Sequence, residues 1–384
     1  MKKICLIVCV MILAPALAFA DDEAAPAEMV FSGEVKTGLL WDQIYEPNPG
    51  AQDTVSRARL GNNDDAGEPG RIRLNGELTK GNIGFRMRWE LFDYKAAIAP
   101  LWAYVYAYGD FIDGQLRLSG GRLGQSPWST GGYELWKELD NVGGLRVEGK
   151  PHVVEGLNVG FVLNGFNAPA VAIAEDQKLE KILAETIIGA SYTHEYFHVR
   201  AAWRFDSTGE GGDGNYNGGA LDTGEGQEFV YRVEERVLSN YVDGLSIFAN
   251  GYFKGIMARN PDDNNYVNWV YIQYKPEAFP LDAQLRTGLD AGYKKYIFKL
   301  KPVVTYSVTD FFRPGIILYY DKDFGEAAPS KDKPYKTVAV EPFLRFTLMN
   351  DMYADIAYRY QQEYTAVDRQ RTTNWVNIRF VYFF

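Results

Sequence analysis

Cysteine is almost absent from this chain, and histidine occurs only three times in 384 residues. Both cysteines, Cys5 and Cys9, lie in an apolar run over residues 4–17. Two lysines precede that run and Ala18-Phe19-Ala20 follows it, which is the pattern of a secretory signal peptide. Residues 1–20 are therefore expected to be removed. The remaining chain has no cysteine, which excludes disulfides, zinc–thiolate sites and cysteine nucleophiles.

Long apolar segments are also missing. No stretch after residue 20 has about 18 consecutive apolar residues, so helical membrane spans are not expected. Without the two lysines of the signal peptide, 38 basic residues face 50 acidic ones, a net charge of −12. Such an acidic chain is a poor partner for nucleic acid. An exported protein without disulfides is then either a soluble secreted protein or a membrane β-barrel.

Aromatic residues, in contrast, are abundant. They make up 15% of the chain, although its mean hydropathy is only −0.26. They occur within segments that alternate strictly between apolar and polar residues, as over residues 83–91, where Ile83, Phe85 and Trp89 alternate with Arg86 and Arg88. Each such segment has one apolar and one charged face. Many reach the 9 to 11 residues that a transmembrane strand needs, whereas soluble strands average about 5 or 6.

The pattern predicts eighteen strands in an all-β fold, a closed antiparallel transmembrane β-barrel with short periplasmic turns and long outer loops. Sixteen strands are the alternative, because segments 143–149 and 314–321 have the weakest pattern. Residues 21–28 are expected to be a short periplasmic lead-in and 29–384 the barrel, with both ends periplasmic. The expected strands are 29–41, 70–80, 83–92, 100–110, 114–123, 143–149, 157–166, 185–193, 196–206, 227–238, 244–257, 266–275, 283–293, 296–308, 314–321, 335–348, 351–361 and 374–384. Residues 42–69 are expected to form a long loop.

The last expected strand carries a family resemblance. Residues 375–384 read WVNIRFVYFF, with alternating apolar residues and a terminal phenylalanine. This segment resembles the C-terminal assembly signal of bacterial outer-membrane proteins, and the whole pattern resembles porins in its architecture. The matching positions are Asn377, Phe380, Tyr382 and Phe384, whereas Arg379 stands where the family usually has glycine. The resemblance implies the barrel-assembly machinery and outer-membrane lipids as partners, and association into a homotrimer is left open.

In general porins the third outer loop folds into the barrel and narrows the pore. The segment from Gln125 to Asn141 has the corresponding position, and its carboxylates Glu134, Glu138 and Asp140 are candidate constriction residues by that resemblance. The alternative is an ordinary outer loop.

The charged faces of the strands are expected to point into a water-filled lumen, because water and opposite charges offset the cost of placing charges at membrane depth. The candidate pore-lining residues are Arg71, Arg73, Arg86, Arg88, Arg117, Arg146, Arg200, Arg204, Arg286, Arg345, Arg359, Glu77 and Glu90. The alternative for any one arginine is that it only cross-links neighbouring strands.

Two motifs suggest metals but have structural explanations. His194-Glu195-Tyr196-Phe197-His198 matches the H-E-x-x-H pattern, which binds zinc only on a helix, and here it lies between two strand-like segments. Residues 213–218 match the first half of a calcium-binding loop, but Glu225 falls one position too late. No metal or cofactor is therefore expected, and a calcium site in this loop is left open.

The expected function is passive diffusion of small hydrophilic solutes and ions through an outer-membrane porin, without catalysis. The net charge mildly favours cations, although outer loops could hold much of it. Three tyrosines at Tyr104, Tyr106 and Tyr108 and the set of arginines suggest an alternative, a channel selective for saccharides or anions. Alternatives of another class are an outer-membrane barrel enzyme, for which three histidines offer little material, and a soluble secreted β-protein.

Overall fold

The computed structural model describes residues 26–48, 51–60, 71–92, 99–110, 114–124, 126–130, 135, 143–164, 186–204, 227–255, 265–292, 294–325, 334–366 and 369–384. Within these ranges, the side chains of 46–48, 51–60, 90–92, 99–101, 164, 365–366 and 369–370 are not described. The expected signal peptide, most of the lead-in, the calcium-like loop and the three candidate constriction carboxylates lie outside the described residues.

The described chain forms one antiparallel sheet of nineteen strands. Its strands are β1 Ala27–Asn48, β2 Ala51–Leu60, β3 Arg71–Lys80, β4 Ile83–Phe92, β5 Ala99–Asp110, β6 Gly114–Arg122, β7 Gly143–Pro151, β8 Leu157–Asn164, β9 Ile187–Thr193, β10 Phe197–Arg204, β11 Glu228–Glu235, β12 Leu245–Lys254, β13 Asn265–Tyr274, β14 Leu281–Gly292, β15 Lys295–Tyr306, β16 Phe312–Asp323, β17 Lys336–Met349, β18 Met352–Ala366 and β19 Arg369–Phe383. No helix long and apolar enough to cross a membrane occurs in the described residues.

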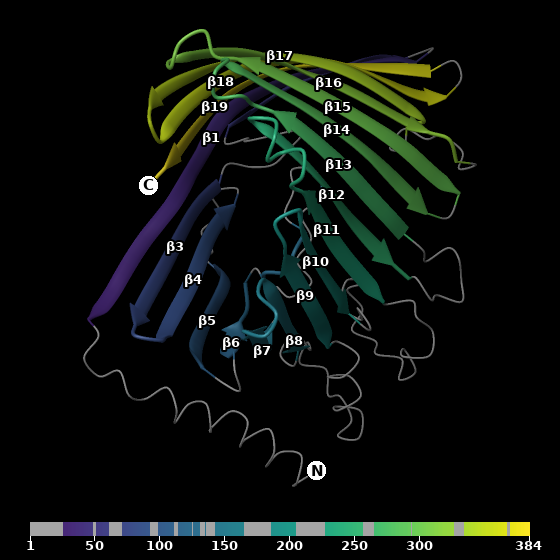
Figure 1. Ribbon diagram of the computed structural model, residues 1–384. Helices are drawn as coiled ribbons and strands as arrows, with labels where there is room; N and C mark the ends of the chain where they lie inside the picture. The colour runs from purple at the N-terminus through teal and green to yellow at the C-terminus, as the bar shows by residue number, and fades with distance from the viewer. Residues whose placement is uncertain are drawn as a thin grey trace, which may run out of the picture.

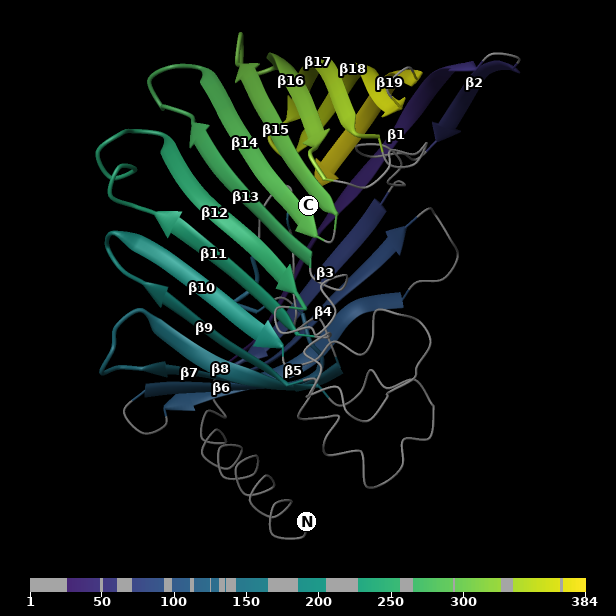
Figure 2. The same cartoon turned by 90° about the vertical axis from the view of Figure 1, so that its right-hand side faces the viewer.

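The sheet closes on itself through β1 (Figures 1 and 2). Residues 27–36 of β1 pair with β3, and residues 34–45 pair with β19 on the other side. From β3 to β19 each strand pairs with the next, so eighteen of the nineteen strands form the ring. The predicted count of eighteen is confirmed, and the alternative of sixteen is wrong, because both weakly patterned segments form strands, β7 and β16.

The extra strand corrects one prediction. Residues 42–69 were expected to be a loop, but β1 continues to Asn48 and β2 folds back on it, from Asn48 opposite Ala51 to Leu39 opposite Leu60. β2 pairs with the second half of β1, on the same side on which β3 pairs with the first half. β2 therefore continues beyond β3 along β1 and is not one of the eighteen strands that form the ring. Its sequence AQDTVSRARL has few apolar residues, which is why hydrophobic alternation did not reveal it.

The apolar side chains face outward. In β15, Tyr296, Phe298 and Val304 are 51%, 36% and 40% exposed, whereas Lys301 and Val303 between the outward positions are 8% and 7% exposed. The same alternation runs through the other strands, which leaves an apolar outer surface and a polar interior. A soluble sandwich would instead bury its apolar face against a second sheet. This inverted arrangement is the one that strands in contact with lipid require.

The connections differ between the two ends of the barrel. One end has short turns, such as Gly81–Asn82 between β3 and β4, residues 194–196 between β9 and β10, and residues 350–351 between β17 and β18. Gly81 has a φ of 55°, a left-handed conformation that favours glycine in a tight turn. The other end carries the longer connections, including residues 205–227 and 255–264. The start of β1 and the C-terminus lie at the short-turn end (Figure 1).

The last residue completes the seam of the barrel. The backbone N–H of Gly33 donates to the carbonyl of Phe384 at 2.7 Å, and the N–H of Phe384 donates to the carbonyl of Gly33 at 3.1 Å. Phe380, Tyr382 and Phe384 are 42%, 43% and 48% exposed on the outer surface. The alternating face predicted for this strand is therefore present, with its aromatic rings directed outward.

Candidate functional site

The interior of the barrel contains all the candidate pore-lining residues whose side chains are described, because they occupy the polar positions of the alternation. Only Glu90 is left open, since its side chain is not described. Two features shape this interior. A segment that follows β6 folds against the wall near β8 to β12, and a cavity lies near the short-turn end between β13 and β19.

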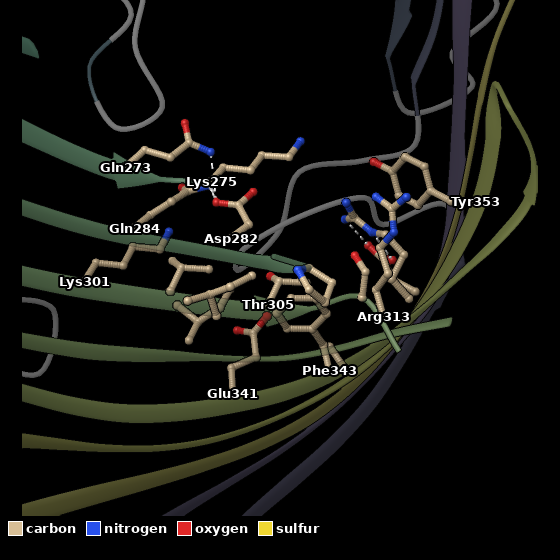
Figure 3. Close-up of a pocket in the computed structure, with 18 of the residues that line it drawn as sticks. Gln273, Lys275, Asp282, Gln284, Lys301, Thr305, Arg313, Glu341, Phe343 and Tyr353 are labelled. Carbon is tan, nitrogen blue, oxygen red and sulfur yellow. Dashed lines mark hydrogen bonds and ion pairs between the residues drawn. The ribbon is translucent and has the colours of Figure 1, made fainter. Parts of the chain in front are cut away.

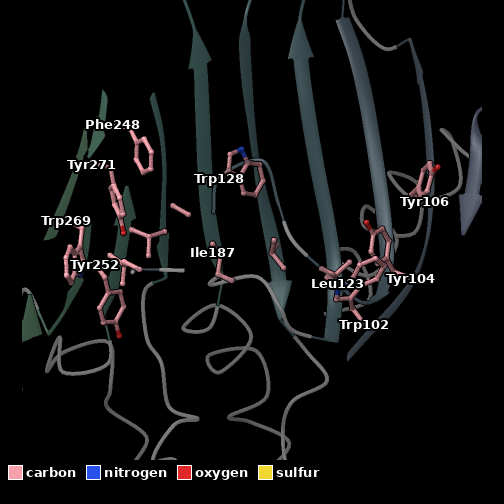
Figure 4. Close-up of a cluster of buried hydrophobic side chains, with 14 residues drawn as sticks. Trp102, Tyr104, Tyr106, Leu123, Trp128, Ile187, Phe248, Tyr252, Trp269 and Tyr271 are labelled. Atoms are coloured by element: carbon pink, nitrogen blue, oxygen red, sulfur yellow. The ribbon is translucent and has the colours of Figure 1, made fainter. Parts of the chain in front are cut away.

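Trp128 anchors the folded-in segment. Its side chain is completely buried, and its indole N–H donates to the Asn158 side-chain oxygen of β8 at 3.3 Å. The ring lies against Gly160 and Gly189 of β8 and β9, where a Cβ atom at either position would overlap the indole. Figure 4 shows Trp128 inside the wall beside Ile187. Because the two glycines have no side chains, the indole ring fits directly against the wall at these positions.

Wall side chains hold the backbone of the same segment. Arg200 and Arg232 donate to the carbonyl of Thr130 at 3.0 and 3.2 Å, and Asn250 of β12 donates to the carbonyl of Leu135 at 3.0 Å. Thr130 is completely buried and Leu135 is 7% exposed. The segment was predicted by resemblance to fold inward, and the described residues 126–130 and Leu135 do lie inside the barrel.

Most interior arginines are paired with carboxylates. Seven of the predicted arginines form ion pairs with N–O distances of 2.5 to 3.1 Å. These pairs are Arg71–Glu34, Arg73–Glu34, Arg86–Glu77, Arg146–Glu148, Arg204–Glu228, Arg345–Asp355 and Arg359–Glu341. Arg200 lies 3.8 Å from Glu234. All of these pairs except Arg146–Glu148, which lies within β7, join neighbouring strands. The paired charges also cancel much of each other, so cross-linking of the wall is part of what these arginines do.

A row of aromatic rings lies on the interior face of β5. Trp102, Tyr104, Tyr106 and Tyr108 follow one another with ring centroids 5.7 to 6.4 Å apart. Arginines cover several of them, with the guanidinium of Arg117 4.3 Å from the Tyr106 ring centre and those of Arg88 and Arg146 over Trp102 and Tyr104. Cations above aromatic faces attract the rings. The predicted tyrosine row therefore forms a continuous aromatic and cationic strip, of which Figure 4 shows the rings of Trp102, Tyr104 and Tyr106.

The cavity between β13 and β19 has a volume of about 1070 Å³. Seven basic residues line it, namely Lys36, Lys275, Arg286, Lys301, Arg313, Arg345 and Arg379. Four acidic residues accompany them, Glu277, Asp282, Glu341 and Asp355. Figure 3 shows side chains of Lys301, Arg313, Glu341 and Tyr353 reaching from different strands into this space.

The basic residues of the cavity stand opposite one another in the sheet. Arg286 of β14 is the register partner of Lys301 of β15, and Arg313 of β16 is the partner of Arg345 of β17. Like charges directly opposite across two strands repel each other. Arg286 donates to the Gln284 side-chain oxygen, at 2.6 Å from its terminal nitrogen. This side of the wall therefore presents a positive potential to the cavity.

A second cavity of about 520 Å³ adjoins the tyrosine row and is lined by five basic residues, Arg86, Arg117, Arg146, Lys150 and Arg200, and by two acidic ones, Glu77 and Glu148. Both cavities therefore carry more basic than acidic side chains, which is opposite in sign to the chain as a whole.

The contacts of Arg379 give a structural reason for an arginine at this position, where the resemblance predicts glycine. Its guanidinium points inward and bonds to Asp355 of β18, which also accepts two hydrogen bonds from Arg345 at 2.7 and 2.8 Å. Asp355 is 2% exposed. One carboxylate thus joins β17, β18 and β19 beside the seam of the barrel, where Asn377 also faces the cavity.

Replacing Asp355 with asparagine is expected to destabilise the barrel by roughly 2 kcal/mol, because both arginines lose their charged acceptor while remaining partly buried. The temperature at which the folded protein loses its fast migration on a detergent gel measures this. Asp351→Asn, in the exposed turn before β18, is the matched control and should leave that temperature unchanged. Equal temperatures for both variants would show that the three-strand link contributes nothing.

Several interior residues were not predicted. Three of them follow the same alternation and could have been predicted from it: Lys301, and Arg232 and Arg371, which pair with Glu234 and Glu363. Trp128 and Asn250 were not, because their partners are distant in sequence and no local pattern reports them.

The zinc-like motif spans a turn and the start of β10, as expected for a segment between two strands. Residues 194–196 connect β9 to β10, and the His194 N–H donates to the Phe197 carbonyl at 2.8 Å. His198 bonds through Nδ1 to the Thr193 hydroxyl at 2.7 Å, so the two histidines are not one helical turn apart. Among the described residues no group of three or more His, Cys, Asp or Glu side chains is placed to hold a metal ion.

No family model and no curated protein matches this chain. Solved structures do. The anion-selective porin from Comamonas acidovorans has a TM-score of 0.50 at 13% sequence identity, over 93% of this chain and 100% of that one. A triple mutant of the Rhodopseudomonas blastica porin has a TM-score of 0.45 at 13% identity, over 92% and 100% of the two chains. The chain is therefore similar in fold to the Comamonas porin.

Proposed function

We propose that this protein is an outer-membrane porin, a water-filled channel through which small hydrophilic solutes and ions diffuse passively. The observation that carries this proposal is the inversion of polarity in a closed ring of eighteen strands, apolar outside and charged within. A ring of this size has room for an aqueous lumen in addition to side chains. An exposed apolar belt disfavours the soluble alternative, since such surface requires lipid or a partner.

The orientation follows from the connections. The short-turn end, with the C-terminus, faces the periplasm and the longer connections face outward, as in outer-membrane barrels generally. The outward aromatic residues at the C-terminal end, Phe380, Tyr382 and Phe384, are proposed to serve as the assembly signal, and outer-membrane lipids surround the barrel. The charges and aromatic rings named above are proposed to line the solute pathway.

The proposed ion preference is for anions. The net charge of the whole chain suggested cations, but the cavities in the interior carry more basic than acidic side chains, seven against four and five against two. A permeating ion responds to the charges of the wall, because charges separated by more than about 10 Å are screened at 0.1 M salt. The sign of the charge that lines the lumen therefore decides the ion preference, and in both cavities this charge is positive.

Single-channel recording of the purified, folded protein in a planar bilayer tests the function. Stepwise conductance increases are expected, and in a potassium chloride gradient the reversal potential should have the sign of chloride permeation. Cation preference would contradict the role given to the two cavities, and absence of any channel from folded protein would contradict the porin itself.

The aromatic strip of β5 favours a second candidate, a channel selective for saccharides. Rings flanked by hydrogen-bonding groups, such as the Tyr106 hydroxyl that donates to Glu77 at 2.8 Å, offer both stacking and polar contacts to a sugar. Solute-dependent block of the current, with neutral and acidic sugars compared, would distinguish this candidate from general diffusion.

A further inference from the structure

Two lysines stand opposite each other on the outer surface of the barrel. Lys322 is the last residue but one of β16, Lys336 is the first of β17, and the two are register partners. They occupy outward positions of the alternation, in line with Leu318 and Val338, which are 44% and 37% exposed. Two like charges directly opposite on one face of a sheet repel each other, so this position favours a bound anion.

Aromatic rings rather than carboxylates surround the pair. The Lys322 ammonium lies 4.5 Å from the ring centre of Phe324, and the Lys336 ammonium lies 5.0 Å from that of Tyr364 and 6.0 Å from that of Tyr320. Within the part of the chain that the structure describes, neither lysine has an ion pair. Among the described residues, the two charges are therefore compensated by aromatic rings alone.

The neighbouring carboxylates point the other way. Asp321 and Asp323 flank Lys322 along β16 but occupy inward positions of the strand. Asp323 also accepts hydrogen bonds from the backbone N–H groups of Tyr296 and Gly325, at 2.9 and 2.8 Å. On β18, Glu363 faces inward and pairs with Arg371. No described acidic side chain thus faces the two lysines from β16 or β18.

An apolar groove lies next to the lysines on the same outer face, toward the middle of the barrel. It has a volume of about 540 Å³, and its lining includes Leu300, Pro302, Leu318, Val338 and Val340, with Tyr360 and Gln362 at one side. The four strands that form it, β15 to β18, run side by side in Figures 1 and 2.

Two prolines account for the groove. Pairing between β15 and β16 runs to Leu300 and resumes at Val303, so that Pro302 lies in the interruption. Pairing between β17 and β18 is likewise interrupted between Val340 and Phe343, where Pro342 lies. Proline has no N–H to donate to the ladder. The sheet is therefore open at two adjacent places, and the outer surface is hollowed there.

We propose that Lys322, Lys336 and this groove together bind a lipid with a phosphate-bearing, negatively charged headgroup. The phosphate lies between the two ammonium groups, and an acyl chain lies in the groove. The commitment to a lipid rests on the continuity of the two parts, since a free anion would use the lysines but leave the apolar groove empty. The inference depends on the proposed membrane location, because only there does this face meet lipid.

Native mass spectrometry of the folded, full-length protein in detergent tests the site, with dioleoyl phosphatidylglycerol as the probe. One tightly held lipid per chain is expected. The double variant Lys322→Gln/Lys336→Gln should weaken its binding about 30-fold, or ~2 kcal/mol, at roughly 1 kcal/mol for each lysine near an anionic lipid. Lys80→Gln, which removes an outward lysine at the opposite end of the barrel, should leave the binding unchanged.

Two further measurements distinguish a lipid headgroup from free phosphate as the bound anion. Dioleoyl phosphatidylcholine, which has the same chains but a neutral headgroup, should bind far more weakly, and inorganic phosphate should not displace the lipid. Equal retention of both lipids, or unchanged binding by the double variant, would overturn the proposal, and so would full displacement by inorganic phosphate. Channel conductance of the same preparation is measured in parallel, so a failure of this site is distinguishable from a failure of the porin function.

Discussion

Replacing Arg286 and Lys301 with glutamate is expected to reverse the ion preference of the channel from anions to cations. The two residues are register partners on β14 and β15 and line the large interior cavity together. Seven basic and four acidic side chains line that cavity. The double variant would leave five basic and six acidic ones, so the sign of the wall changes while its shape is largely kept.

The expected effect is large because four units of charge change close to the path of the ion. At about 7 Å in water, this alters the energy of a monovalent ion by roughly 2 kcal/mol before salt screening. Screening reduces the figure, which leaves about a tenfold change in the ratio of chloride to potassium permeability at 0.1 M salt. The reversal potential in a salt gradient measures it, and the effect should decrease as the salt concentration rises.

The matched control is a double variant with the same change in charge on the outer surface of the barrel. Lys80 and Arg122 are exposed at strand ends and occupy outward positions, so Lys80→Glu/Arg122→Glu adds four negative units without touching the lumen. This control should keep the anion preference. If both double variants shift the reversal potential equally, the preference depends on the overall charge of the protein and not on the cavity.

The barrel itself was largely predictable from the sequence because its signal is local. The expected segments 70–80 and 83–92 coincide with β3 and β4 to within one residue, and the short link between them is the expected turn. The wall of the barrel is a single sheet, so successive side chains face the outer surface and the lumen in turn. The sequence therefore alternates between apolar and polar residues with a period of two. The same period identified which arginines face inward.

Features that depend on distant partners were beyond local patterns. Nothing near Trp128 in sequence indicates that Gly160 and Gly189 leave room for its ring. Likewise, the sequence placed Arg200 on the wall but did not show that its guanidinium holds the Thr130 carbonyl. β2 was missed for a different reason, since its residues are mostly polar and it pairs outside the ring. The roles of the interior residues in permeation remain predictions.

The second large effect concerns the segment folded into the barrel. Trp128→Ala is expected to release this segment from the wall and to increase single-channel conductance, because the side chain is its only completely buried aromatic anchor among the described residues. Removing a buried tryptophan costs about 3–5 kcal/mol. The hydrogen bonds to the Thr130 and Leu135 carbonyls remain, each worth about 1 kcal/mol net, or up to about 3 where the donor is charged. Larger and noisier current steps are the expected recording.

A second variant approaches the same contact from the wall. Gly189→Val places a branched side chain where the indole lies, so it should displace Trp128 and raise the conductance in the same way. Trp89→Ala is the control, since Trp89 is 39% exposed on the outer surface and its loss should leave the conductance unchanged. Because Trp128→Ala changes the folded-in segment and Gly189→Val changes β9, a shared increase cannot come from a general weakening of one strand. Unchanged conductance in both, in barrels that remain folded on a detergent gel, would mean that the segment lies beside the solute path and does not restrict it.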